Sequence, residues 1–188
     1  VGDTSGQETE GGVFVNIIQP RPADTPSATE PGINVFYYAL EQLSQLPNFD
    51  ELTPFGDEIV GDVNYPSTGG DFMGSGLSDD IGAVFEGFVE VQETNMYTFY
   101  VNSDDGSKLF VGNQLIVDND GLHGMNEKSG GILLAQGLHE VRVEFFERGG
   151  GAGCIVSISS DMMAKEVIPS DSYSHEVTEC IGDINNNG

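Results

Sequence analysis

Two adjacent aspartates, Asp104 and Asp105, form the residue pair in this sequence that is best suited to chemistry. They lie in the run SDDGSKLF, and Gly106 follows them, so the chain can turn sharply there. Adjacent side chains of a regular strand point to opposite faces, whereas a turn allows both carboxylates to converge on one point. Converging carboxylates repel unless a cation lies between them, and Ca²⁺ is the hard ion that prefers such oxygen ligands. The alternative is a solvated acidic turn without a metal.

Two polar loops later in the chain contain further candidate residues. The loop VDNDGLHGMNEKSG carries Asp118, Asp120, His123 and Glu127, which could line a ligand site. The alternative is a long loop stabilised by Asx turns, with His123 hydrogen-bonded to the backbone. The loop FFERGGGAG, at residues 145–153, is rich in glycine and exposes backbone groups that could ligate calcium or contact a ligand. Its alternative is a flexible loop tip.

Short apolar runs separated by turn signals must position these loops. Strands are predicted at 33–40, 83–91, 96–103, 130–135, 139–146 and 154–159, with a hairpin at 108–118 around Gly112-Asn113. In the run HEVRVEFF, Val141, Val143 and Phe145 face one side, while Arg142 and Glu144 face the other. The pattern predicts an all-β fold, an antiparallel β-sandwich with long loops and one or two short helical turns at most.

The charge balance excludes several classes of partner. The 188-residue chain has 6 basic and 31 acidic residues, a formal net charge of -25. Binding to nucleic acid or to an anionic membrane surface needs clustered lysine and arginine, so neither partner is expected. No apolar stretch reaches the ~18 residues of a membrane helix, so direct membrane insertion is not expected either. The acidity suits calcium binding, or solubility through self-repulsion alone.

The sequence divides into three predicted parts. Residues 1–31 are polar and proline-rich and form an N-terminal linker with one strand at 12–18. Residues 32–165 are predicted to form the β-sandwich, and residues 166–188 a C-terminal tail. Because the chain begins at Val1 without a start methionine, we expect it to be a piece of a longer protein.

The C-terminal tail carries two features that leave alternatives open. Asp183, Asn185 and Asn187 in GDINNNG match the opening of a dockerin-type or EF-hand-like calcium loop, and the alternative is a flexible Asn-rich end. The two cysteines, Cys154 and Cys180, fit no zinc pattern. They either form one disulfide that ties the tail to the domain, as in extracellular proteins, or remain independent thiols.

The order of these features resembles the protective-antigen-type domain family. The resemblance covers roughly residues 32–160, and it rests on the aromatic strand 97–100, the SDDGS turn, the DNDG-x-HG loop, the LHEVRVEFFE strand and the GGGAG loop. That family occurs in yeast flocculins and adhesins, in bacterial surface adhesins, in glycosidases and in a toxin component. The resemblance implies a β-sandwich with calcium in a loop pocket.

The resemblance also implies the residues of the site. In lectin members, the aspartates that match Asp104 and Asp105 are joined by a cis peptide, which turns both carboxylates toward one ion. The implied calcium ligands are Asp104, Asp105, Arg148, Gly149 and Gly150. The implied sugar contacts, made by two neighbouring hydroxyls, are Asp104, Asp105, His123, Arg148, Gly150 and Gly151. Glu147 and Arg148 depart from the expected loop, and the Arg148 guanidinium, which has no acceptor, leaves only its carbonyl for the metal.

Three functions remain open from the sequence. The first is a calcium-dependent lectin module of a secreted or cell-surface protein, which binds mono- or oligosaccharides and glycans on another cell or matrix, as an adhesin does. The second is a structural or interaction module that calcium makes rigid. The third is an accessory domain of a glycosidase, although no carboxylate pair stands out as catalytic. We expect the first, an extracellular module that is not an enzyme.

Overall fold

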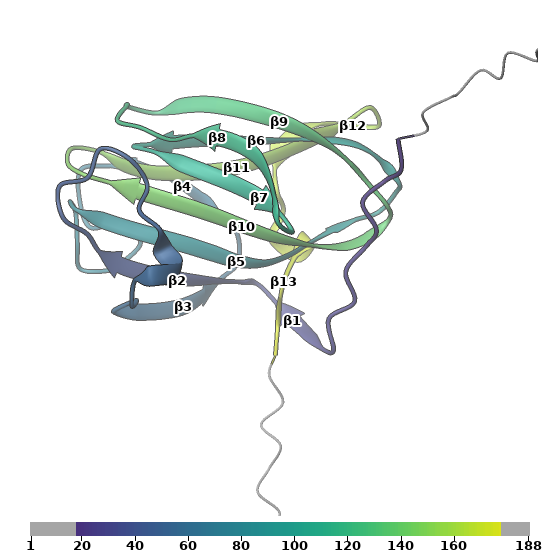
Figure 1. Cartoon of the computed structure of the whole chain (residues 1–188), viewed down its shortest axis with the longest axis horizontal. Coiled ribbons are helices and arrows are strands. Elements are labelled where there is room, and N and C mark those ends of the chain that lie inside the picture. The colour runs from purple at the N-terminus through teal and green to yellow at the C-terminus, as the bar shows by residue number, and fades with distance from the viewer. Residues whose placement is uncertain (1–17, 178–188) are drawn as a thin grey trace, which may run out of the picture.

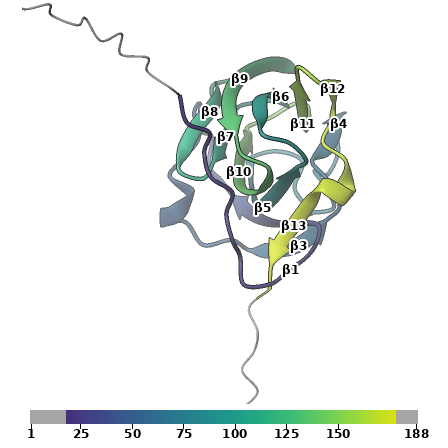
Figure 2. The ribbon, with the colours of Figure 1, turned by 90° about the vertical axis from the view of Figure 1, so that its right-hand side faces the viewer.

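The structure is a computed structural model, which describes residues 18–177. Two antiparallel sheets lie face to face and enclose the core (Figure 1), and the view along the strands shows the two layers (Figure 2). The predicted all-β sandwich is confirmed, and the helical content of the described residues is two short 3-10 helices, Phe49–Glu51 and Ser170–Ser172. No helix within this part of the chain is long and apolar enough to cross a membrane.

Within residues 18–177, thirteen strands make up the two sheets. The larger sheet contains β1 (Thr29–Pro31), β2 (Ile33–Ala39), β3 (Gly56–Val60), β5 (Ile81–Val91), β7 (Ser107–Val111), β8 (Gln114–Asn119), β10 (Gly137–Glu147) and β13 (Tyr173–Glu176). The smaller sheet contains β4 (Asn64–Thr68), β6 (Asn95–Asp104), β9 (Asn126–Leu134), β11 (Ala152–Ser160) and β12 (Met163–Val167). The central strands of the two sheets are therefore β5 and β10 on one side and β6 and β11 on the other.

Alternation along the strands places the core between the sheets. On β10, Val141, Val143 and Phe145 are buried, while Arg142 lies on the outer face and pairs with Glu86, Glu144 and Asp50. The predicted facing of this strand is thus confirmed. The predicted hairpin is also present, because β7 and β8 pair across the turn that contains Gly112, whose φ is 57°.

The β-structure extends beyond the boundaries that the sequence predicts. β1 begins at Thr29 and pairs with β13, which ends at Glu176 and also pairs with the central strand β5. The two short strands therefore close the edge of the larger sheet from opposite ends of the described chain. The predicted strand at 12–18 lies almost wholly outside the described residues, and the predicted calcium loop at 183–188 lies wholly outside them.

Strands β8 and β9 approach each other closely at Gly130, where the two sheets meet along one side. A Cβ atom at Gly130 would overlap the backbone carbonyl of Ile116, whereas at neighbouring Gly131 the nearest atoms lie 3.7 Å away. We expect Gly130→Ala to lower the free energy of unfolding by about 2–3 kcal/mol, because backbone must move. Gly131→Ala, the matched control, should change it by less than about 0.5 kcal/mol. Urea denaturation of both variants tests this, and equal losses would contradict it.

The N-terminal segment docks onto the sandwich through a buried histidine. His139 is fully buried, its Nε2 donates to the carbonyl of Ala135 at 2.7 Å, and its Nδ1 lies 2.8 Å from the Arg21 guanidinium. Since a guanidinium only donates, Nδ1 accepts and the imidazole is neutral. Burial, with a contribution from Arg21, lowers the pKa of His139.

This arrangement predicts a loss of stability in mild acid. The unfolded chain, in which the pKa of His139 is ordinary at about 6.5, binds the proton more readily than the folded chain does. The contribution of His139 is therefore full above that pH and declines as the pH falls below it. We expect the free energy of unfolding, measured by urea denaturation, to fall more between pH 7.5 and pH 5.0 in the wild type than in His139→Gln. Glutamine keeps a hydrogen-bond donor and an acceptor at this position. The same loss in both proteins would exclude His139 as the cause.

Candidate metal and ligand site

The aspartate pair lies where β6 ends, on the smaller sheet. The peptide bond between Asp104 and Asp105 is cis, as the family resemblance implies. Buried hydroxyls flank the pair, since Ser103 Oγ and Ser107 Oγ are 2.7 Å apart and Asn119 Nδ2 donates to Ser103 Oγ at 3.1 Å. These three side chains have no exposed surface. The turn that carries the aspartates is therefore held from below by a buried hydrogen-bond network.

Both aspartates anchor other loops through hydrogen bonds. Asp105, which is 7% exposed, accepts from the backbone amide of His123 at 2.8 Å and from that of Arg148 at 3.2 Å. Asp104, which is half-buried, accepts from Ser67 Oγ at 2.9 Å. The pair thus joins the loop after β8, the glycine loop after β10 and the end of β4.

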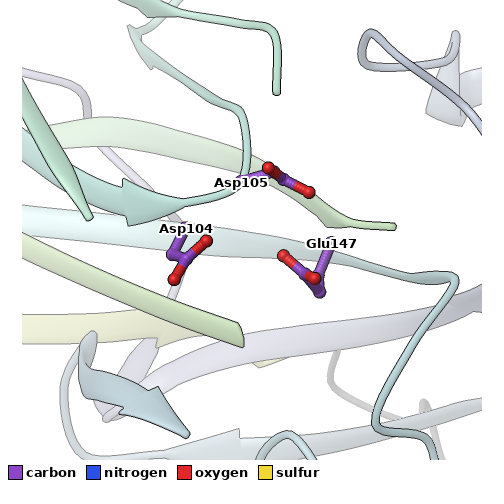
Figure 3. A group of neighbouring side chains, drawn as sticks. All are labelled: Asp104, Asp105 and Glu147. Carbon is purple, nitrogen blue, oxygen red and sulfur yellow. The ribbon is translucent and has the colours of Figure 1, made fainter. Parts of the chain in front are cut away.

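A third carboxylate, that of Glu147 at the end of β10, faces the pair from the larger sheet (Figure 3). One oxygen from each of Asp104, Asp105 and Glu147 lies within 4.8 Å of the others. Glu147 is fully buried, and neither of its carboxylate oxygens has a hydrogen-bond partner among the described residues. Burial, together with the neighbouring Asp105, raises the pKa of Glu147 to about 8.

Glu147 is absent from the ligand set that the sequence resemblance implies. The signal for it was nonetheless present, because Glu147 continues the buried series Val141, Val143 and Phe145 at a spacing of two. An acidic residue in an inward-facing series is costly to bury without a partner. The strand pattern alone could therefore have marked Glu147 as a buried acid, although not its place beside the aspartates.

The glycine loop lies against the aspartates, as expected. A Cβ atom at Gly151 would overlap Ser67 Oγ and approach Asp104 Oδ2 at 2.9 Å, so a larger residue there would displace the side chains of Ser67 and Asp104. Gly150, at a φ of 117°, donates from its amide to Asp79 Oδ1 at 3.2 Å. The carbonyl of Arg148 accepts a long hydrogen bond, 3.4 Å, from the amide of Asp80. The predicted ligand role of the Arg148, Gly149 and Gly150 backbone stays a prediction.

His123 stands beside the pair through its backbone. Its ring nitrogens lie 3.1 Å from the carbonyl of Gly124 and 2.9 Å from that of Asn119, within its own loop. This hydrogen bonding to backbone matches the alternative that the sequence left open. The predicted contact between His123 and a sugar stays a prediction.

Asp118 accepts a hydrogen bond from the amide of Asp120 at 3.1 Å, and the two other acidic residues of that loop form ion pairs. Asp120 accepts from the amide of Leu46 at 2.8 Å and pairs with Lys108 at 3.1 Å. Glu127 pairs with Lys165 on the outer face of the smaller sheet. Neither carboxylate belongs to the cluster around Asp105.

The cysteine on β11 lies in the core. Cys154 is fully buried, and burial raises the pKa of its thiol to about 12. Its proposed disulfide partner, Cys180, lies outside the described residues, so the pairing stays a prediction.

The three carboxylates fit a hard divalent cation. They come from both sheets, carry up to three negative charges and offer only oxygen, which suits Ca²⁺ better than a metal that prefers nitrogen or sulfur. The unpaired, buried oxygens of Glu147 are the strongest structural sign, because a buried carboxylate normally has a partner.

Comparison with known proteins gives matches to one domain family and to proteins of differing roles. A family model described as the PA14 domain matches residues 30–172. The PA14 sugar-binding domain from an RTX adhesin is 25% identical, with a TM-score of 0.66 over 77% of this chain and 98% of that one. The epithelial adhesin 9 A domain of Candida glabrata, solved in complex with Galβ1-3GlcNAc, shares the fold at 13% identity, with a TM-score of 0.65 over 84% of this chain and 96% of that one.

One curated relative is named as an anti-sigma factor and not as an adhesin. The anti-sigma-I factor RsgI3 of Acetivibrio thermocellus is 33% identical over 85 residues, which are 45% of this chain. The match spans only 13% of the length of that protein. The relationship therefore concerns one region of a much longer protein.

Proposed function

Because this chain belongs to the PA14 domain family, we propose that it is a calcium-dependent carbohydrate-binding module of a secreted or cell-surface protein. Its ligands are mono- or oligosaccharides of glycans on another cell or on a matrix. One observation carries the proposal: the fully buried Glu147 brings two unpaired carboxylate oxygens to the Asp104-Asp105 turn. The similarity to an adhesin domain that is named as sugar-binding supports it.

Electrostatics supports a cation at this place. When all three carboxyls are charged, which for Glu147 means above its pKa of about 8, they make three pairs, and two unit charges 4.8 Å apart repel by about 3 kcal/mol at an effective dielectric constant of about 20. A divalent cation among Asp104, Asp105 and Glu147 turns this repulsion into attraction. The hydrogen bonds to Asp105 from two backbone amides fix the orientation of its carboxylate before any ion arrives.

A sugar fits this site through its hydroxyls. When bound, Ca²⁺ supplies open coordination positions, which two neighbouring hydroxyls of a sugar ring can take. Asp104 is the most exposed of the three carboxylates, so its free Oδ1 can accept a hydrogen bond from one of these hydroxyls. Gly151 has no side chain that would block the approach beside Asp104.

We propose binding without catalysis. Hydrolysis of a glycosidic bond uses two carboxylates about 5–9.5 Å apart, on either side of the bond that breaks. Here one carboxylate oxygen from each of Asp104, Asp105 and Glu147 lies within 4.8 Å of the other two, which suits one shared ion. The glycosidase relationship of the family therefore does not make these residues catalytic.

A second candidate is a module in which calcium only makes the loops rigid. It is favoured by the way Asp105 joins the loops of His123 and Arg148, because an ion held at Asp105 would fix both. Calcium binding without any response to sugar would support this function.

The test is calorimetric titration with fucose, mannose, glucose and galactose, in calcium and again in excess EGTA. We expect at least one sugar to bind in calcium, and binding to disappear in EGTA and in Asp104→Asn. Since Asp104 is half-buried, this variant should fold and leave the sandwich intact. Sugar binding that persists in EGTA would overturn the proposed mechanism, and the absence of binding by every sugar, on a glycan array as well, would leave the loop-rigidifying function.

A further inference from the structure

A cavity of about 300 Å³ lies at the end of the sandwich opposite the three carboxylates; we name it the far-end cavity. It opens between the end of β5, the start of β6, and the turn that connects β11 and β12. Tyr97 lines it, while Asp104 is seven residues further along β6. At about 3.3 Å per residue the two sites are roughly 23 Å apart. The far-end cavity is therefore independent of the candidate calcium site.

The floor of the far-end cavity is apolar. Val91, Tyr97, Ile158 and Ile168 line it, and each is less than 10% exposed. The Tyr97 hydroxyl donates to the backbone carbonyl of Glu93 at 2.9 Å, so the floor presents no unsatisfied hydroxyl to a ligand. Such a floor favours an apolar group over a sugar. The volume of the far-end cavity is at the small end of the range for ligand sites and suits one ring system or a short alkyl chain.

The mouth of the far-end cavity is acidic. Glu90, Glu93 and Glu166 line it, and no lysine or arginine does. None of these three glutamates takes part in an ion pair with another residue of the 18–177 range. Carboxylates at the rim of an apolar hollow attract a positive charge that sits at the entrance. The mouth thus complements a cationic group.

The lip of the far-end cavity is adaptable. Met162, at the β11–β12 turn, is 77% exposed, and Met163 beside it is half-buried. Methionine has an unbranched, polarizable side chain that adjusts to the shape of what it covers. An exposed methionine next to an apolar floor can therefore close over an apolar group.

We propose that the far-end cavity binds a small amphipathic cation, a molecule with one apolar ring or chain and one ammonium or guanidinium group. The apolar part occupies the floor between Val91 and Ile158. The cationic group remains at the mouth, between the carboxylates of Glu93 and Glu166. This site does not depend on calcium or on the proposed sugar binding.

The test uses three probes of one shape: naphthylmethylammonium, naphthylmethanol and naphthoate. Their binding to the whole chain is followed by amide chemical-shift changes in NMR spectra at low salt. We expect shifts around Ile158 and Ile168 and an affinity for the ammonium at least about fivefold above that for the alcohol, with the naphthoate weakest. EGTA should not change these values. Equal affinities for ammonium and alcohol, or shifts that occur elsewhere, would overturn the proposal.

Variants distinguish attraction of the cation by the glutamates at the mouth of the cavity from attraction by the net charge of -25. Glu93→Gln/Glu166→Gln should abolish the preference for the ammonium and leave binding of the alcohol intact. The control Glu41→Gln/Glu51→Gln makes the same change in net charge at two exposed positions between β2 and β3, the second of them in the 3-10 helix Phe49–Glu51, and it should keep the preference. Ser160→Trp, at the half-buried rim, should block all three probes. Loss of the preference in the control would show that only the overall charge attracts the cation.

Discussion

Replacing Asp105 with asparagine is expected to weaken calcium binding by more than about a hundredfold. Loss of a partner outside the coordination shell already costs a metal site about 10–100-fold, and here a charged ligand is lost. Asp105 is the more constrained aspartate of the pair, because it is 7% exposed and accepts hydrogen bonds from two backbone amides. Asparagine has the same shape and can still accept one of these hydrogen bonds, so the loops should stay in place.

Calorimetric titration with Ca²⁺ measures this effect directly. Asp57→Asn is the matched control, since Asp57 lies exposed on the edge strand β3 and the charge change is the same. The control should bind calcium as the wild type does. If Asp105→Asn bound calcium with unchanged affinity, the three carboxylates would not be the metal site.

The aspartate turn could be predicted from the sequence because its determinants are local. Asp104, Asp105 and Gly106 are adjacent, and a strand on each side fixes where the turn falls. The facing of β10 was equally predictable, because a period of two needs no knowledge of the partner strands. Local patterns of this kind gave the sandwich and its hairpin.

The rest depends on contacts between residues far apart in the chain. Glu147 joins the aspartates only because β10 and β6, from different sheets, end at the same place. The short strands β1 and β13 are stable through their pairing, as the three-residue run TEP of β1 has no strand signal of its own. Contacts between distant parts of the chain therefore determine both how far the sheets extend and the position of Glu147 beside the aspartates.

Replacing Glu147 with glutamine is expected to make the protein more stable than the wild type without calcium and less stable than the wild type with calcium. At pH 9, above the Glu147 pKa of about 8, the buried and unpaired carboxylate is charged and destabilises the calcium-free fold, and glutamine of the same shape removes one charge from the cluster. We expect the variant to be more stable in EGTA by about 1–3 kcal/mol, in line with the cost of a buried unsatisfied group. In calcium at a thousand times its Kd, the wild type should gain about 4.1 kcal/mol, and the variant much less.

Urea denaturation of the wild type and of Glu147→Gln at pH 9, in EGTA and in calcium, provides the four free energies of unfolding that this comparison needs. Glu140→Gln is the matched control on the same strand, because Glu140 is exposed and its loss should shift both states equally. A Glu147→Gln variant that is less stable than the wild type in EGTA would mean that the carboxylate stabilises the empty site. The reversal, if measured, would show that Glu147 is kept at a cost to the calcium-free fold, which binding the ion offsets.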